Sequence, residues 1–148
     1  MNKFKSASMV IRYAMVCLAA WHVAGFTADN DGWTDLGGWM LSNNDYRIQH
    51  FSRGPLHRLV LQRSVGTGRK AVWKPVAVLN TPPLSADSRI GTNFECLLPG
   101  ETGDVVAMAR EGRGTDIVVH AWRIDVRKKY FQSVDPTRVR CKLDRGDG

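Results

Sequence analysis

The chain has 148 residues, of which 43% are apolar and 24% are charged, and its formal net charge is +7. This length suits one domain and excludes a large barrel enzyme or a two-domain dehydrogenase. The apolar content is too high for a disordered protein, and the sequence lacks the repeats of collagen or a coiled coil.

Residues 1–28 have the three-part pattern of a secretory signal peptide. The chain starts with a basic region without acids, formed by Lys3, Lys5 and Arg12. An apolar run from Tyr13 to Trp21 follows, and cleavage after Gly25 or Ala28 would suit a signal peptidase. We therefore predict a signal helix and a periplasmic or secreted protein. A membrane anchor is less favoured, because a spanning helix needs about 20 apolar residues.

Residues 29–55 are rich in Asp, Asn and Gly and show little periodicity. We predict a loop-rich N-terminal segment with one short strand, Tyr46–Phe51. The stretch from Asp29 to Asp35 resembles half of a calcium loop, but the closing acidic ligand is missing. We therefore expect a solvated loop there and no metal site.

Residues 56–148 are predicted to form one β domain that begins with a hairpin. Its strands are Leu56–Val65 and Ala71–Leu79, joined by a Gly-containing connection. Pro75 cannot donate to a ladder, so its strand must be an edge or must break there. The connection lacks the Ser or Thr and the following helix of a phosphate-binding loop.

A loop from Asn80 to Thr92 precedes further predicted strands at about ten-residue spacing. These strands are Asn93–Leu98, Asp104–Arg110, Asp116–Val126, Tyr130–Val134 and one around Val139–Leu143. In the longest of them, period two places five side chains on one face: Val118, His120, Trp122, Ile124 and Val126. No helical period follows residue 28. We predict an all-β, mainly antiparallel fold, either a small sandwich, an open barrel or a curled meander.

Three cysteines are present, and Cys17 would leave with the signal peptide. The remaining pair, Cys96 and Cys141, is expected to form a disulfide in an oxidising compartment. A metal site would need further closely spaced ligands, so no cofactor or metal is expected. Cys141 falls on the apolar face of the last strand, which is where it could reach Cys96.

A C-terminal pattern carries a resemblance to a known group of proteins. The pattern is Ala121-Trp122-Arg123-Ile124-Asp125, then Phe131, then Val139-Arg140-Cys141. It resembles small exported proteobacterial proteins without assigned function. The resemblance implies export and a β-rich domain with a disulfide, and it implies no reaction.

Three histidines, His50, His57 and His120, are candidates for chemistry. A hydrolase needs a nucleophile beside a base, and no Gly-x-Ser-x-Gly sequence is present. We expect His120 to be a hydrogen-bonded residue of the core or its rim. An exported hydrolase that uses His57 or His120 remains an alternative, as does an inhibitor of a host or rival hydrolase.

Basic residues concentrate near the C-terminus, and those proposed for binding are Arg123, Arg138, Arg140 and Lys142. The last three alternate with apolar residues, so we expect them to share one face of the last strand. Without the signal peptide, 18 Lys and Arg stand against 14 acids, a net charge of +4. Nucleic acid is not an expected partner of an exported chain. We predict a non-enzymatic binding or accessory module that meets an acidic protein, a glycan or an anionic envelope surface.

Overall fold

The computed structural model describes residues 32–113 and 115–143, and the predicted signal helix lies outside them. The described chain holds ten β-strands and no α-helix. The strands are β1 (Thr34–Met40), β2 (Tyr46–Arg53), β3 (Leu56–Val65), β4 (Val72–Asn80), β5 (Ser88–Gly91), β6 (Cys96–Leu97), β7 (Val105–Arg110), β8 (Ile117–Asp125), β9 (Tyr130–Val134) and β10 (Arg140–Cys141). There are also two short 3-10 turns: η1 (Gly68–Lys70) lies between β3 and β4, and η2 (Pro136–Arg138) lies between β9 and β10.

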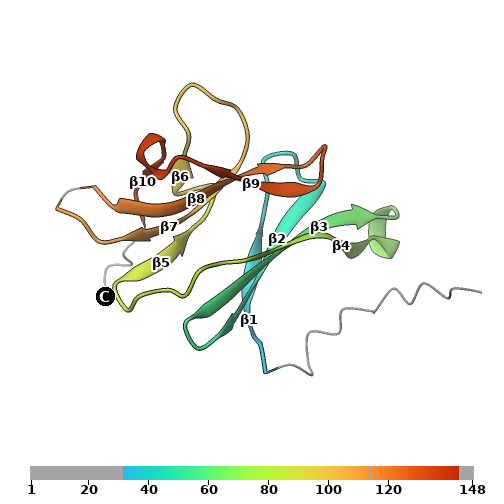
Figure 1. The fold of residues 1–148 in the computed structure, drawn as a ribbon. Helices are drawn as coiled ribbons and strands as arrows, with labels where there is room; N and C mark the ends of the chain where they lie inside the picture. Colours follow the sequence, from blue (N-terminus) through green and yellow to red (C-terminus); the bar gives the residue numbers. More distant parts are fainter. Residues whose placement is uncertain (1–31, 114, 144–148) are drawn as a thin grey trace, which may run out of the picture.

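The strands form two open four-stranded sheets and a two-stranded ribbon (Figure 1). The first sheet has the order β1-β2-β3-β4, the second has the order β5-β7-β8-β9, and the ribbon pairs β10 with β6. Every pairing is antiparallel. The predicted all-β antiparallel fold is therefore confirmed, as a sandwich of open sheets without barrel closure.

One apolar core lies between the two four-stranded sheets. Its buried members come from both sheets and include Ile48, Leu59, Leu61, Val106, Met108, Trp122 and Ile124. Burial of these faces stabilises the sandwich by roughly 25 cal/mol for each Å² of apolar surface removed from water.

A second core lies on the other face of the second sheet, beneath the ribbon. It gathers small residues of β7 and β8 with the disulfide and the last apolar residues, namely Val105, Ala107, Ala109, Ala121, Cys96, Leu98, Val139, Cys141 and Leu143. Gly91 allows this close packing, since a Cβ there would lie 2.6 Å from Cys96 Sγ. The second sheet is therefore covered on both faces.

The segment predicted to be loop-rich, residues 29–55, contains its predicted short strand Tyr46–Phe51 within β2, but the loop expected over Thr34–Met40 is wrong. Both β1 and β2 lie within it, and β2 continues into β3 as a hairpin across residue 55. The strand β1 is an exposed edge whose ladder shifts between Asp35 and Gly38. Gly38 sits there because a Cβ would lie 2.2 Å from the Ile48 carbonyl oxygen. The glycines that suggested a loop therefore lie in an edge strand with a bulge, where a residue without a side chain is needed.

A second difference lies in the segment predicted as a loop from Asn80 to Thr92. It contains the short edge strand β5, which pairs with β7 from Ser88↔Arg110 to Gly91↔Ala107. By contrast, the strand predicted over Asn93–Leu98 shrinks to the two residues of β6.

A bulge in β8 alters the predicted faces of the longest strand. Met108 pairs with His120, but the next residue, Ala109, pairs with Val118, so Val119 is the extra residue. Val119 then packs against the core between the sheets, while Val118 packs against the core beneath the ribbon. The placement of Val118 on the face of Trp122 was therefore wrong.

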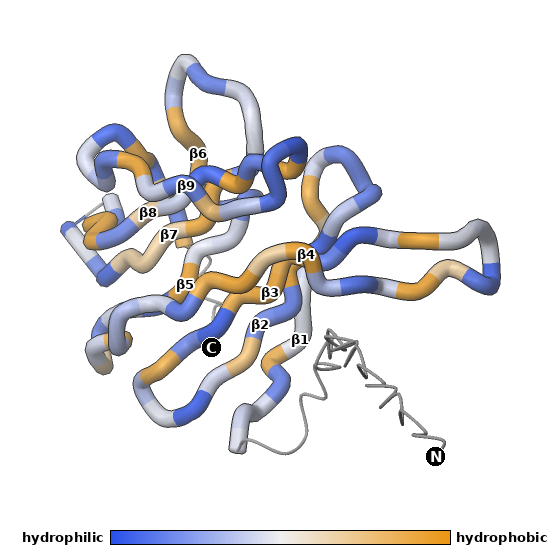
Figure 2. Tube along the Cα trace, turned by 45° about the vertical axis from the view of Figure 1, so that its right-hand side comes forward, coloured by the Kyte–Doolittle hydropathy of each residue, from blue (hydrophilic) through white to orange (hydrophobic). Residues whose placement is uncertain are grey.

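The hairpin of β3 and β4 extends beyond the rest of the first sheet as an arm that ends at η1 (Figures 1 and 2). The hairpin and the position of β4 at a sheet edge confirm the sequence prediction. Pro75 pairs with Gln62 beside a register shift, which is where a residue without an amide donor is tolerated.

Candidate functional site

Two of the four predicted binding residues share one carboxylate. Arg123 Nη1 lies 2.8 Å from Glu101 Oε2, and Arg138 donates to Glu101 Oε1. Arg123 also donates to Gln132 Oε1 at 2.7 Å. Glu101 thus neutralises part of the positive charge that the sequence analysis proposed for binding a partner.

Arg140 and Lys142 are exposed and alternate with buried residues of the second core, as predicted. Arg138 belongs instead to η2, so the three cations do not share one strand. Arg140 pairs with Leu97, whose side chain is 57% exposed. This end of the molecule therefore carries two outward cations near an apolar side chain.

His120 does not lie in the core. Its side chain is exposed at the bulge of β8, and its ring is stacked on Trp122 with the centroids 6.0 Å apart. Trp122 itself is buried in the core between the sheets. His120 therefore lies at the rim of the core, as one of the two expected positions, and the contact described for its ring is the stacking on Trp122 and not a hydrogen bond.

His50 and His57 meet across the hairpin of β2 and β3. His50 Nε2 lies 2.7 Å from His57 Nδ1, and the edge of the Trp39 ring lies against His50. Burial, with a smaller contribution from the nearby His57, lowers the pKa of His50 to about 4, although Asp35 acts in the opposite direction. Burial also lowers the pKa of His57. Both imidazoles are therefore neutral at pH 7.

A covalent mechanism with this pair as the base would require a side-chain nucleophile at hydrogen-bond distance. Within residues 32–113 and 115–143, no hydroxyl or thiol donates to either imidazole. The hydroxyl of Thr81 bonds to the backbone carbonyl groups of His57 and Pro82 instead.

Because of this histidine pair, we expect the folded protein to lose stability in mild acid. Since the pKa of His50 is lower in the folded chain than in the unfolded chain, the unfolded chain binds more protons between pH 6.5 and about 4. The free energy of unfolding should fall over this interval, by about 1–2 kcal/mol after discounting for partial exposure of the ring. Urea unfolding at several pH values measures it. His50→Gln should flatten the dependence and His120→Gln should not; parallel curves for all three proteins would contradict the prediction.

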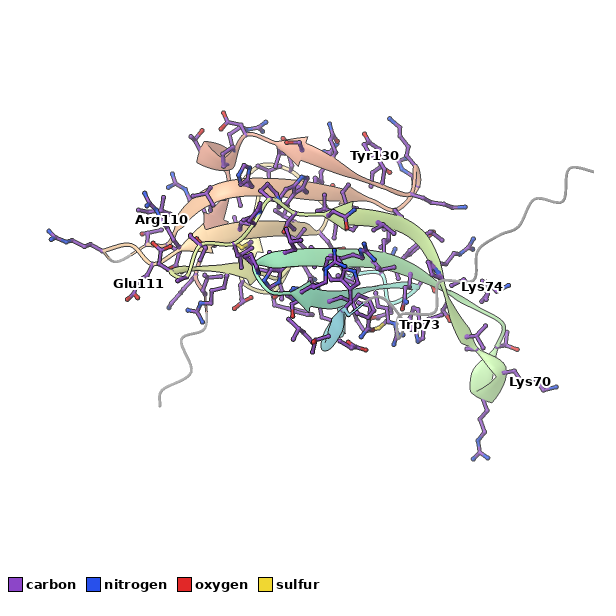
Figure 3. The ribbon with its side chains drawn as sticks, turned by 60° about the horizontal axis from the view of Figure 1, so that its bottom comes forward. Lys70, Trp73, Lys74, Arg110, Glu111 and Tyr130 are labelled. Carbon is purple, nitrogen blue, oxygen red and sulfur yellow. A yellow bond between two sulfur atoms is a disulfide. The ribbon has the colours of Figure 1, made fainter. Side chains whose placement is uncertain are left out.

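The largest concentration of positive charge lies in the first sheet, where sequence reasoning missed it. Residues 46–86 contain seven Lys and Arg and no acid: Arg47, Arg53, Arg58, Arg63, Arg69, Lys70 and Lys74. The signal in the sequence is this absence of acids, because the cations themselves are spread over 41 residues and form no dense run. Folding brings these cations onto β2, β3, β4 and the arm. Figure 3 shows Lys70 at the tip of the arm, with Trp73 and Lys74 behind it.

Two similar side-chain groups lie on the outer face of this sheet, opposite the core. In the first, the Arg47 guanidinium lies 4.7 Å from the centroid of the Trp73 ring, and Arg47 Nε donates to Gln62 Oε1 at 2.6 Å. We call this group the arm triad. It spans three strands, because Arg47 reaches across β3 toward β4.

In the second group, the Arg58 guanidinium lies 4.1 Å from the centroid of the Trp33 ring, and Arg58 Nε donates to Asn80 Oδ1 at 2.9 Å. We call this group the base triad. Arg53 adds a second guanidinium over the same ring, at 4.9 Å. In both triads the guanidinium of an arginine lies over a tryptophan ring. An amide oxygen accepts a hydrogen bond from its Nε, so the two contacts together orient the guanidinium.

Asp35, an acid of the edge strand β1, lies close enough to Arg47 to act on its charge. Asp35 of β1 accepts hydrogen bonds from Gly37 N at 2.7 Å and from Gln49 Nε2 at 2.6 Å. Desolvation lowers the pKa of Arg47 and Asp35 opposes that effect, but the guanidinium remains charged throughout the physiological range.

In comparisons with known proteins, no family model, curated protein or solved structure matches the chain. Among the residues that the structure describes, no three potential ligands gather into a metal site. The same residues contain no helix of the length and apolar character needed to cross a membrane.

Proposed function

We propose that the protein is a small exported binding module, without enzymatic activity, that holds an anionic partner on the basic surface of its first sheet. The observation that supports this proposal is the acid-free stretch from residue 46 to residue 86, which folds into three adjacent strands. Adjacent cations on a rigid sheet create a positive potential that attracts an acidic glycan, protein or envelope surface.

Export to the periplasm or beyond is part of the same proposal. A disulfide between Cys96 and Cys141 suits an oxidising compartment, and the first 28 residues have the composition of a signal peptide. The C-terminal cations remain candidates for a second contact, although Glu101 already pairs with Arg123 and Arg138.

Two charge-reversal variants of equal magnitude test the proposal. The first replaces Arg63, Lys70 and Lys74 by Glu, and the second replaces Arg138, Arg140 and Lys142 by Glu. Both remove the same charge from exposed positions. On a dextran sulfate column, we expect the first variant to elute at a clearly lower salt concentration than the second, because its cations belong to a stretch of the chain that contains no acid.

Circular dichroism should show that both variants keep the β fold. Equal elution of the two variants would mean that only net charge matters, and that result would refute a site on the first sheet. A larger loss of retention on the column in the second variant would show that the C-terminal residues, and not the first sheet, bind the anion.

A further inference from the structure

We propose that the arm, residues 63–74, inserts end-on into the headgroup layer of an anionic lipid bilayer. This inference rests on the proposed function and selects one of the partner classes named there, the envelope surface. The arm is the part of the first sheet that projects from the body of the protein, with Lys70 at its tip (Figures 1 and 3). A projecting element of this kind can reach a flat surface before the rest of the domain does.

Four cations of the arm have no described counter-charge. They are Arg63, Arg69, Lys70 and Lys74, and all four are exposed. Within the described residues, none of them forms an ion pair or a side-chain hydrogen bond. Arg63 and Lys74 lie directly opposite each other in the ladder, a pairing of like charges that destabilises a hairpin. Anionic headgroups around the arm would relieve this repulsion, so the charge pattern suits the bound state better than the free one.

The charged and apolar side chains of the arm lie on both of its faces. Side chains alternate along a strand, so the pair Arg63↔Lys74 and the pair Ser64↔Trp73 point to opposite faces. Val72, which is 53% exposed, shares the face of Lys74. A glycan or a protein surface would contact one face of the arm, whereas a headgroup layer surrounds an element that enters it end-on. The distribution of side chains therefore favours a bilayer.

The end of the arm combines positive charge with apolar side chains, which is the composition of a peripheral membrane contact. Ala71 and Val72 are exposed, and Trp73 is half-buried with the Arg47 guanidinium over its ring. Tryptophan is enriched at the boundary between headgroups and acyl chains. Long basic side chains keep their charge among the headgroups while their stems cover apolar surface. The arm thus offers both parts of such a contact.

The length and the hydrogen bonding of the arm suit shallow insertion. Beyond Arg63 the strand β3 advances about 7–10 Å before the chain turns, and one headgroup layer is about 5–7 Å thick. The tip pairs its own amides, because Lys70 N donates to Thr67 O at 3.2 Å and Ala71 N donates to Gly68 O at 3.1 Å. A backbone that leaves bulk water needs such partners, so the tip can enter the layer without losing hydrogen bonds.

A second surface that carries apolar and basic side chains lies at the ribbon, and it fits an anionic bilayer less well. Phe94, just before β6, is 75% exposed, and Leu97 is 57% exposed and pairs with Arg140. Two acids, Glu95 and Glu101, accompany this surface in the chain, whereas the stretch from residue 46 to residue 86 contains none. The arm is therefore the better candidate for contact with anionic headgroups.

The test is sedimentation with vesicles of phosphatidylglycerol and phosphatidylcholine in equal parts, compared with vesicles of phosphatidylcholine alone. Two exposed valines of the edge strand β4 form a matched pair, Val72 in the arm and Val78 over the body of the sheet, which are 53% and 44% exposed. Val72→Gln should weaken binding to the mixed vesicles by about three- to tenfold. Val78→Gln should leave it unchanged. Equal effects of the two variants would overturn the proposal, as would equal binding to the neutral vesicles.

Tryptophan emission gives an independent measure of insertion. Adding the mixed vesicles should shift the emission of the original chain to shorter wavelength, because the ring of Trp73 moves into a less polar layer. The shift should be smaller in Trp73→Phe and unchanged in Trp33→Phe. All these proteins carry the same amino-terminal segment, so a difference between them reports the arm. An equal shift in the three proteins would contradict insertion of the arm.

The possible failures can be told apart. If Phe94→Gln loses vesicle binding while Val72→Gln keeps it, the ribbon and not the arm contacts the bilayer, and the inference fails. If Val72→Gln binds like the original chain while the Glu variant of the arm does not, the arm attracts anions without insertion, so the inference fails and the proposed function stands. If the Glu variant of the arm keeps both vesicle binding and retention on dextran sulfate, both fail.

Discussion

Replacing both bridged cysteines, with Cys96→Ala and Cys141→Ala together, should lower the free energy of unfolding by about 4 kcal/mol. The disulfide spans a sequence separation of 45 residues, and a cross-link of that length removes much conformational freedom from the unfolded chain. Both sulfurs also lie in the core beneath the ribbon, so their loss removes packing there. Urea unfolding monitored by tryptophan fluorescence gives the change directly.

A reducing agent provides the matched control for this effect. It should shift the urea midpoint of the original chain toward that of the double variant and should leave the double variant unchanged. Coincident unfolding curves for the original chain and the double variant would show that the bond contributes nothing to stability.

The second large effect is expected at Trp122. Its side chain is 8% exposed and packs in the core between the sheets, with His120 stacked on it. Trp122→Ala would leave a cavity that neighbours on two rigid sheets cannot close, so we expect a loss of about 3–5 kcal/mol. Thermal or urea unfolding measures it, and Trp122→Phe should recover part of the loss.

Trp73→Ala serves as the matched control. Trp73 is only half-buried on the outer face, where its main described contact is the Arg47 guanidinium. Loss of that contact should cost on the order of 1 kcal/mol. An equal loss in the two alanine variants would contradict the assignment of Trp122 to the core.

The strands that the sequence predicted well are those with strong apolar periodicity. The elements β3, β4, β7, β8 and β9 all appear within two residues of their expected ends. Each contributes a face to one of the cores, so the alternation of apolar residues directly reflects burial. The disulfide was also predictable, because two cysteines remained once the signal peptide was set aside.

The strands that were missed lie at sheet edges. Both β1 and β5 are edge strands with many exposed residues, and backbone hydrogen bonds to a better neighbour hold them in place. Their sequences therefore carry no apolar period that a one-dimensional analysis can detect. The bulge at Val119 was missed for a related reason, since an extra residue interrupts period two without any special residue type to mark it.

The candidate site depended on contacts between distant parts of the chain. Arg47, Gln62 and Trp73 come from three strands, and no local spacing indicates that they meet. In the same way, Glu101 lies far in sequence from the arginines that it pairs with. The resemblance to exported proteobacterial proteins, carried by the pattern around Trp122 and Cys141, stays a prediction.

The position of the sulfurs along the chain has a consequence for the order of folding. All strands of the first sheet pair with immediate sequence neighbours and are complete at Asn80, before Cys96 is reached. Such short-range pairing closes small loops and is kinetically favoured. If the chain is exported amino end first, as we propose, the strands of the first sheet can pair before Cys141 enters the oxidising compartment. The disulfide would then form late, after the first sheet has paired its strands, and would cross-link the ribbon that covers the second sheet.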